Sequence, residues 1–218
     1  MVMIKCPNCG KITKDNVKIY DDSLRKQNIG ISPILPTCKL CGFEVVISHI
    51  CDGGNLIVLN GTCGSGKTTI AEVFIDKGWL AIDGDCAIQS LRHKKGTKQY
   101  EWKELINEIA CEIDILSLFC KNIVLSHIIL PEDYKKFIEL FKSRNIKYNL
   151  ILLKPEYQTA VERCRLRTCH TTITPEKWIK HFYDILVFDD RFDIVDNSDM
   201  SVQDTAETIL NYIEDRND

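Results

Sequence analysis

The chain has 218 residues, of which 44% are hydrophobic and 27% charged, so it holds enough apolar material for a packed core. This composition excludes a fibrous or wholly disordered chain, and the length indicates one domain with a small appendage. The formal net charge of −3 excludes a generic polyanion binder. The longest apolar runs, such as Phe43–Ile47 and Leu56–Leu59, are too short to cross a bilayer, so we expect no membrane partner.

Residues 1–50 differ in composition from the rest of the chain. They carry seven basic and four acidic side chains, a net charge of +3, against −6 for residues 51–218. The chain has eleven cysteines, yet it opens with Lys5 and Cys6 rather than with an apolar export signal. We therefore expect a cytoplasmic protein whose thiols are free or bound to metal.

Two CxxCG repeats in this N-terminal segment have the spacing of zinc ligands. Two residues between the cysteines and a following glycine allow a tight turn that points both sulfurs at one ion. The pattern resembles a zinc ribbon, which implies a small β domain over residues 1–50 with a closed structural Zn²⁺ site. Unrelated buried cysteines and a redox dithiol are the alternatives. The expected zinc ligands are Cys6, Cys9, Cys38 and Cys41.

Beyond a turn-rich joint at 51–55, strand-like apolar runs alternate with segments that have helical periodicity. This alternation predicts an α/β fold in which helices cover both faces of a parallel sheet. Helices are expected from near Lys67 and within 102–116, 134–141, 160–166, 178–186 and 202–213. The expected strands are Leu56–Leu59, Trp79–Ile82, Asn122–Ser126, Tyr148–Leu153 and Phe192–Asp196.

The segment after the first of these strands contains the phosphate-binding motif GxxxxGK[ST] in full. Its glycines let backbone N–H groups face phosphate oxygens, and the N-terminus of the following helix adds partial positive charge. Lys67 can reach the β- and γ-phosphates, and the Thr68 hydroxyl can bind Mg²⁺. A glycine-rich turn without function is the alternative that this context disfavours. The residues expected to bind ATP here are Gly61, Thr62, Cys63, Gly64, Ser65, Gly66, Lys67, Thr68 and Thr69.

Two carboxylates, Asp83 and Asp85, follow the second expected strand. Ligands of an open α/β sheet lie beyond the carboxyl ends of its strands, so both can face the phosphate site. One acid can anchor a magnesium-bound water while the other accepts the proton of an attacking hydroxyl. A solvated Asp-Gly-Asp turn is the alternative.

Two further segments have open interpretations. Arg92–Lys98 is expected to form a basic loop, which either attracts a phosphorylated or carboxylated acceptor or is a solvated connection. The strand Asn122–Ser126 ends without the carboxylate that P-loop ATPases usually carry there, which favours a kinase over an ATPase motor. His127, directly after it, either contacts substrate or is a hydrogen-bonded structural histidine.

The ordered set of these motifs resembles the small P-loop kinases related to shikimate kinase, gluconate kinase and chloramphenicol phosphotransferase. The matching stretches include LNGTCGSGKTT, WLAIDGD and LILLKPEYQTAVERCRLR, and they extend over most of residues 55–218. The resemblance implies a P-loop NTPase-type three-layer sandwich with a five-stranded parallel sheet, use of ATP and Mg²⁺, and a mobile lid over the phosphates.

The resemblance also implies roles for individual residues. Asp85 matches the acid that engages the acceptor hydroxyl, and Asp83 its companion on the metal side. Arg163 matches an arginine beside adenine, and Arg167, or alternatively Arg165, the lid arginine that supports the transferring phosphoryl group. Residues 163 and 167 lie four apart, on one face of the expected helix, although a solvated basic face has the same pattern. The loop at 196–198 matches the one that brackets adenine, which adds Asp196 to the ATP site.

These observations favour an ATP-dependent phosphotransferase whose substrate is a hydroxyl group of a small molecule, with Lys67, Asp85 and Arg167 as its catalytic residues. A nucleotide kinase or a polynucleotide-end kinase, for which the ribbon would supply grip, is a related alternative. The alternative from another class is a module that binds nucleic acid or protein under the control of ATP, without transferase activity. The sequence does not identify the acceptor.

Overall fold

The computed structural model describes residues 2–5, 12–13, 55–117, 122–143, 146–167, 174–186 and 191–214. The four cysteines of the expected zinc ribbon, and the rest of residues 1–50 apart from two short strands, lie outside these ranges. The lid that the resemblance implies is expected at 168–174, and all of it except Thr174 lies outside these ranges too.

The sheet contains the five parallel strands that the sequence predicts, in the spatial order β4, β5, β3, β6, β7. The order of the strands reverses beside the central strand, because β4 and β5 lie on one side of β3 and β6 and β7 lie on the other. Such a switch point is where ligands bind in open α/β sheets. The strands are β3 (Asn55–Asn60), β4 (Leu80–Asp83), β5 (Asn122–Ser126), β6 (Lys147–Leu153) and β7 (Asp193–Val195).

Two N-terminal strands extend this sheet at the β4 edge. Strand β1 (Val2–Lys5) pairs antiparallel with β4, and β2 (Ile12–Thr13) pairs antiparallel with β1. Because β1 pairs with β4, the start of the chain is joined to the edge of the parallel sheet. The first CxxC pair lies between β1 and β2 in the sequence.

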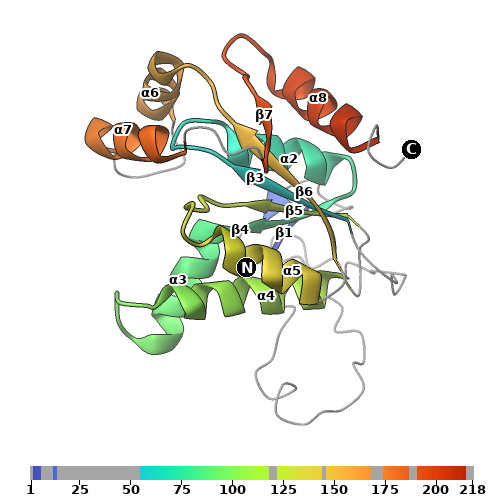
Figure 1. Ribbon diagram of the computed structural model, residues 1–218, viewed down its shortest axis with the longest axis vertical. Coiled ribbons are helices and arrows are strands. Elements are labelled where there is room, and N and C mark those ends of the chain that lie inside the picture. Colours follow the sequence, from blue (N-terminus) through green and yellow to red (C-terminus); the bar gives the residue numbers. More distant parts are fainter. Residues whose placement is uncertain are drawn as a thin grey trace.

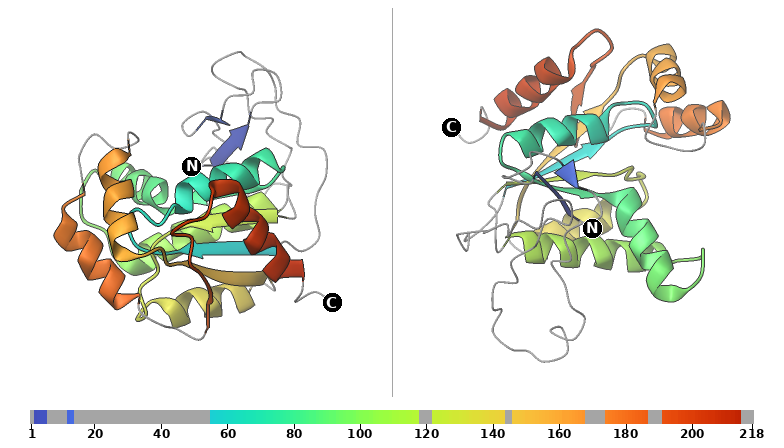
Figure 2. Two further views of the ribbon diagram at one scale, coloured as in Figure 1. Left: turned by 90° about the horizontal axis from the view of Figure 1, so that it is seen from above. Right: turned by 180° about the vertical axis from the view of Figure 1, so that it is seen from behind.

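Helices cover both faces of the sheet and one of its ends (Figure 1). On one face lie α2 (Lys67–Asp76) and α8 (Val202–Glu214). On the other lie α3 (Gly84–Lys95), α4 (Trp102–Ser117) and α5 (Tyr134–Ser143). Helices α6 (Tyr157–Leu166) and α7 (Glu176–Ile185) pack on each other at the end of the sheet where α3 begins (Figure 2). None of the helices within the described ranges combines the length and the apolar character needed to cross a bilayer.

The central strand β3 divides its side chains between two cores. Leu56 and Val58 pack toward α4 and α5, whereas Ile57 and Leu59 pack toward α2 and α8, and all four are fully buried. A strand that is apolar on both faces is what a parallel sheet covered by helices requires. This burial fixes β3 in the middle of the molecule, and the phosphate-binding loop starts directly from its end.

The segment after β4 is helical where the sequence analysis expected a basic loop at 92–98 and no helix. Gly84–Lys95 forms α3, and Asp83 is its N-cap, because its Oδ1 accepts the backbone N–H of Asp85 at 2.9 Å. The helix ends at Gly96, whose φ of +64° is a conformation that glycine adopts readily. The basic residues 92–95 are the last turn of this helix, where positive charge is favoured by the helix dipole.

Candidate active site

The phosphate-binding loop between β3 and α2 depends on glycines at positions that no side chain can occupy. Gly64 has φ +81°, and a Cβ atom there would lie 2.1 Å from the Ala160 carbonyl oxygen of α6. Gly61 has φ +146°, and its Cβ would lie 2.6 Å from the Leu153 carbonyl oxygen at the end of β6. The loop therefore packs tightly against two neighbouring elements, which holds its backbone in the conformation of a phosphate cradle.

Lys67 lies inside the curve of this loop. Its ammonium group donates hydrogen bonds to the carbonyl oxygens of Gly61 at 2.7 Å and Thr62 at 2.9 Å. Burial lowers the pKa of Lys67, and the positive charge of Arg167 acts in the same direction, whereas Cys63, Asp85 and Asp83 oppose the shift. A cation held among carbonyl groups gains by exchanging them for phosphate oxygens, which carry full negative charge.

A cavity of about 710 Å³ joins the loop to the ends of β4 and β5. Its lining includes both acids after β4 and residues from four helices, α2, α3, α6 and α8. The volume is in the range of pockets that hold a ligand the size of a nucleotide or a drug. The lining residues are Cys63, Gly64, Gly66, Lys67, Thr68, Thr69, Ile70, Asp83, Asp85, Cys86, Gln89, Ser126, His127, Ile128, Arg163, Leu166, Arg167, Thr174, Asn197, Met200, Val202 and Thr205.

The oxygen atoms at the base of this cavity suit a magnesium ion that also binds phosphate. The hydroxyl of Thr68 and the carboxylate of Asp83 both line it, and so does Ser126, whose backbone pairs with Asp83. Within the described ranges no group of three or more His, Cys, Asp or Glu side chains gathers into a metal site. Mg²⁺ needs none, because it binds through one or two protein oxygens, phosphate oxygens and water. The residues present therefore fit Mg²⁺ in a shared site with a nucleotide.

Asp85 lies in the first turn of α3 and is exposed to the cavity. Its negative charge raises the pKa values of both Lys67 and His127, against the larger effect of their burial. Asp83 and Asp85 both line the cavity that the phosphate-binding loop also lines, and their roles there stay a prediction.

The structure distinguishes the three arginines of the α6 region. Arg163 donates to the carbonyl oxygens of Asn197 at 2.8 Å and Ser198 at 3.2 Å. Arg165 forms an exposed ion pair with Glu176, 3.2 Å apart, and does not line the cavity. Arg167 lines the cavity and donates to Thr174 Oγ1 at 2.7 Å. Helix α6 ends at Leu166, so Arg167 reaches the cavity from an extended residue rather than from the helix face that its spacing predicts.

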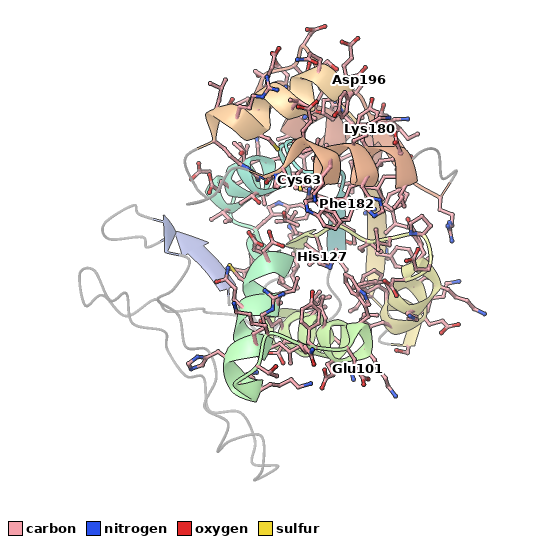
Figure 3. All side chains as sticks on the ribbon, turned by 90° about the vertical axis from the view of Figure 1, so that its left-hand side faces the viewer. Cys63, Glu101, His127, Lys180, Phe182 and Asp196 are labelled. Atoms are coloured by element: carbon pink, nitrogen blue, oxygen red, sulfur yellow. The ribbon has the colours of Figure 1, made fainter. Side chains whose placement is uncertain are left out.

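The loop after β7 meets the phosphate-binding loop through Asn197 rather than through Asp196. Asn197 is buried, lines the cavity and donates from Nδ2 to the Ser65 carbonyl oxygen at 3.0 Å. Asp196 is exposed, is not among the residues that line the cavity, and lies far from His127 in Figure 3. Hydrogen bonds from the Ser198 side chain and backbone lower the pKa of Asp196, so this carboxylate stabilises the turn of its own loop.

The sequence analysis gave little attention to two buried residues, one directly after β5 and one at the end of β3. His127 is buried, lines the cavity near the start of α3 (Figure 3), and donates its backbone N–H to the Leu59 carbonyl oxygen at 3.2 Å. Asn60 is fully buried and exchanges two hydrogen bonds with the Ile129 backbone, at 2.9 and 3.0 Å. Asn60 thereby connects the start of the phosphate-binding loop to the segment that carries His127. An Asn-Gly pair at a strand end was its only sequence signal.

Comparison with known proteins agrees with this site in part of the chain. A family model for chloramphenicol phosphotransferase-like proteins matches residues 54–119, which contain the phosphate-binding loop, both acids and helices α3 and α4. No curated protein sequence matches the chain significantly.

Solved structures match a larger share of the chain at low sequence identity. The tunicamycin resistance protein of Deinococcus radiodurans is 18% identical, with a TM-score of 0.58 over 73% of this chain and 95% of its own. A gluconokinase from Sinorhizobium meliloti is 18% identical, with a TM-score of 0.52 over 75% of this chain and 97% of its own. A sugar kinase from Janibacter sp. is 16% identical, with a TM-score of 0.55 over 75% of this chain and 95% of its own. The described part of the chain from β3 onward therefore has the fold of P-loop kinases.

Proposed function

We propose that this protein is a Mg²⁺-dependent phosphotransferase that moves the γ-phosphoryl group of ATP to a hydroxyl group of a small molecule. The observation that carries the proposal is that Lys67 and Thr68 of the phosphate-binding loop line the same cavity as Asp85 at the start of α3. The kinase fold and the family-model match over this region support it.

In the proposed reaction, the backbone N–H groups of the loop and Lys67 bind the β- and γ-phosphates. Thr68 and Asp83 would hold Mg²⁺, which supplies charge neutralisation when bound. Arg163 and the loop at 197–198 provide the adenine end of the cavity. Only the resemblance assigns Asp196 to the adenine end. Its contribution there would be indirect, because its carboxylate stabilises the turn of the loop at 196–198.

The chemical step needs one proton acceptor and one further cation. The acceptor oxygen bonds to the γ-phosphorus as the bond from that phosphorus to the β–γ bridging oxygen breaks, and ADP leaves. The hydroxyl proton passes to the carboxylate of Asp85. Arg167 stabilises the negative charge on the transferring group, and closing of the lid excludes water.

The test separates nucleotide binding from transfer in the full chain. We expect calorimetry to detect binding of Mg·ATP to the wild type, and an acceptor screen to detect acceptor-dependent ADP formation. Asp85→Asn should lower turnover by at least about 100-fold, the typical contribution of a general base, with ATP affinity retained. The matched control is Asp76→Asn, which should keep full turnover. Asp76 is the last residue of α2, at the end of this helix away from the phosphate-binding loop. Unchanged transfer by Asp85→Asn would refute its role, and failure of the wild type to bind ATP would refute the whole proposal.

We further propose that Cys6, Cys9, Cys38 and Cys41 bind one structural zinc ion in a ribbon formed by residues 1–50, followed by a kinase domain over 55–218. The pairing of β1 with β2 supports this, because these strands flank the first CxxC pair in the sequence. Thiolate ligands imply a reducing, cytoplasmic location.

A further inference from the structure

The basic residues near the cavity are engaged in contacts with other parts of the protein. Lys94 pairs with Glu108 at 2.5 Å and Lys95 with Glu104 at 2.7 Å, both on α4. Arg92 donates to the Lys98 carbonyl oxygen at 3.0 Å and lies over the Tyr100 ring. No residue of the segment 92–98 lines the cavity. The segment that could have attracted an anionic acceptor therefore contributes no residue to the cavity lining.

The cavity wall beyond the phosphate-binding loop holds only acidic charge among the described residues. It is formed by the start of α3 and the end of β5, and its charged side chains are Asp83 and Asp85. The cations of the cavity are Lys67 of α2 and Arg163 and Arg167 of the α6 region, which the proposed function assigns to the nucleotide. An acceptor with its own carboxylate or phosphate would lose hydration on entering and would meet like charge instead of a partner.

His127 supplies a hydrogen-bonding group on this wall. Its ring packs between the aromatic rings of Trp102 and Phe137, each with a centroid distance of 6.3 Å. Its Nδ1 edge faces the backbone of Gly84, where a Cβ atom would lie 2.1 Å away. The Nε2 atom is buried and has no hydrogen-bond partner among the described residues. A buried polar atom without a partner is costly, so a ligand that bonds to it gains affinity.

The imidazole is uncharged under physiological conditions. Burial lowers the pKa of His127 to about 4, and the positive charge of Lys67 contributes in the same direction, whereas Asp85 and Asp133 oppose it. A neutral imidazole offers Nε2 to a hydroxyl or amide group, but it provides no positive charge for a carboxylate or phosphate.

We infer that the acceptor is an uncharged compound with at least two polar groups, a hydroxyl oriented by Asp85 and a second hydroxyl or amide bonded to Nε2 of His127. This inference rests on the proposed phosphotransferase function, since it assigns the acceptor side of the same cavity. His127 is then a specificity-determining residue, held by Gly84, Trp102 and Phe137.

Binding without turnover tests the inference separately from catalysis. The full-length wild type is saturated with Mg²⁺ and the non-hydrolysable analogue AMP-PNP, and calorimetry compares three matched pairs: adenosine with AMP, glucose with gluconate, and ribitol with ribitol 5-phosphate. We expect at least one uncharged compound to bind about tenfold more tightly than its anionic counterpart. His127→Phe, which keeps an aromatic ring but no hydrogen-bonding atom, should weaken that binding about tenfold and leave the affinity for AMP-PNP unchanged. His127→Gln should restore part of it.

Each outcome of this experiment has a distinct meaning. Selective binding of an uncharged compound that disappears in His127→Phe supports the inference, even if no transfer follows, and the absence of transfer would then count against the proposed function alone. Preference for the anionic member of the pairs, absence of binding by every uncharged member, or equal binding by His127→Phe would overturn the inference.

Discussion

At the scale of single residues, the buried imidazole of His127 has a consequence for stability. In the unfolded chain His127 takes up a proton below its ordinary pKa of 6.5, whereas in the folded protein it stays neutral until about pH 4. The unfolded state therefore binds more protons between these values, so the free energy of unfolding falls as the pH falls from 6.5 to 4. From pH 7.5 to 5.0 this one group removes about 2 kcal/mol of stability.

We predict that His127→Gln loses less stability on acidification than the wild type does. Urea unfolding at pH 7.5 and 5.0 should give a fall in unfolding free energy that is about 2 kcal/mol smaller for the variant. His93→Gln serves as the control, because His93 is exposed on α3 and its removal should leave the fall unchanged. Parallel behaviour of the wild type and His127→Gln would show that the imidazole is protonated as readily in the folded protein.

Glycine and asparagine show why the site could be predicted only in part. The GxxxxGK[ST] pattern indicates a phosphate loop because each glycine meets a local backbone requirement, which sequence spacing records. The role of Asn60 depends on Ile129, 69 positions along the chain, and the unpartnered Nε2 of His127 depends on what packs around it. Contacts of this range leave no periodicity in the sequence.

At the scale of elements, the strands were predictable and α3 was not. The five parallel strands are short apolar runs bounded by turn residues, and burial on both faces requires that composition. Helix α3 is mostly polar, and among its described side chains only those of Ala87 and Leu91, four residues apart, are buried. Its remaining signals were an N-cap aspartate, Asp83, which the sequence analysis assigned to the phosphate site, and a terminal glycine, Gly96, which it placed in a basic loop.

The connection between β3 and the segment after β5 leads to a prediction about Asn60. Replacing it with alanine removes the partners of the Gly61 N–H, the Ile129 N–H and the Ile129 carbonyl, which are bonded at 2.8 to 3.0 Å. Because Asn60 is fully buried, these groups would lose their bonds without gaining water. We expect Asn60→Ala to lower the unfolding free energy by about 3 kcal/mol, measured by urea denaturation.

The opposite end of the same strand offers the matched control for this variant. Asn55 is only partly buried and makes a side-chain bond of 3.4 Å to Asn122, so Asn55→Ala should cost less than about 1 kcal/mol. Equal losses for the two variants would mean that the Asn60 hydrogen bonds do not connect these two elements.

At the scale of the whole molecule, the proposed zinc ribbon and the kinase sheet share a continuous set of strands. Strand β1 pairs with β4 through Val2 and Met3, and β4 delivers Asp83 to the cavity. Residues after β1 in the sequence include Cys6 and Cys9 of the expected zinc site. A metal that orders the N-terminal segment therefore stabilises a strand at the edge of the sheet that carries the active site.

We predict that the purified protein contains one equivalent of zinc and that its removal lowers the melting temperature of the whole chain. Total metal analysis of protein prepared without chelator measures the first quantity, and calorimetric melting before and after treatment with a strong zinc chelator measures the second. Cys6→Ser combined with Cys9→Ser should lose the metal, because two thiolates cannot complete a tetrahedral site. Cys63→Ser, a substitution in the phosphate-binding loop outside the expected ligand set, should retain it. Less than about half an equivalent of zinc in the wild type would rule out the metal site.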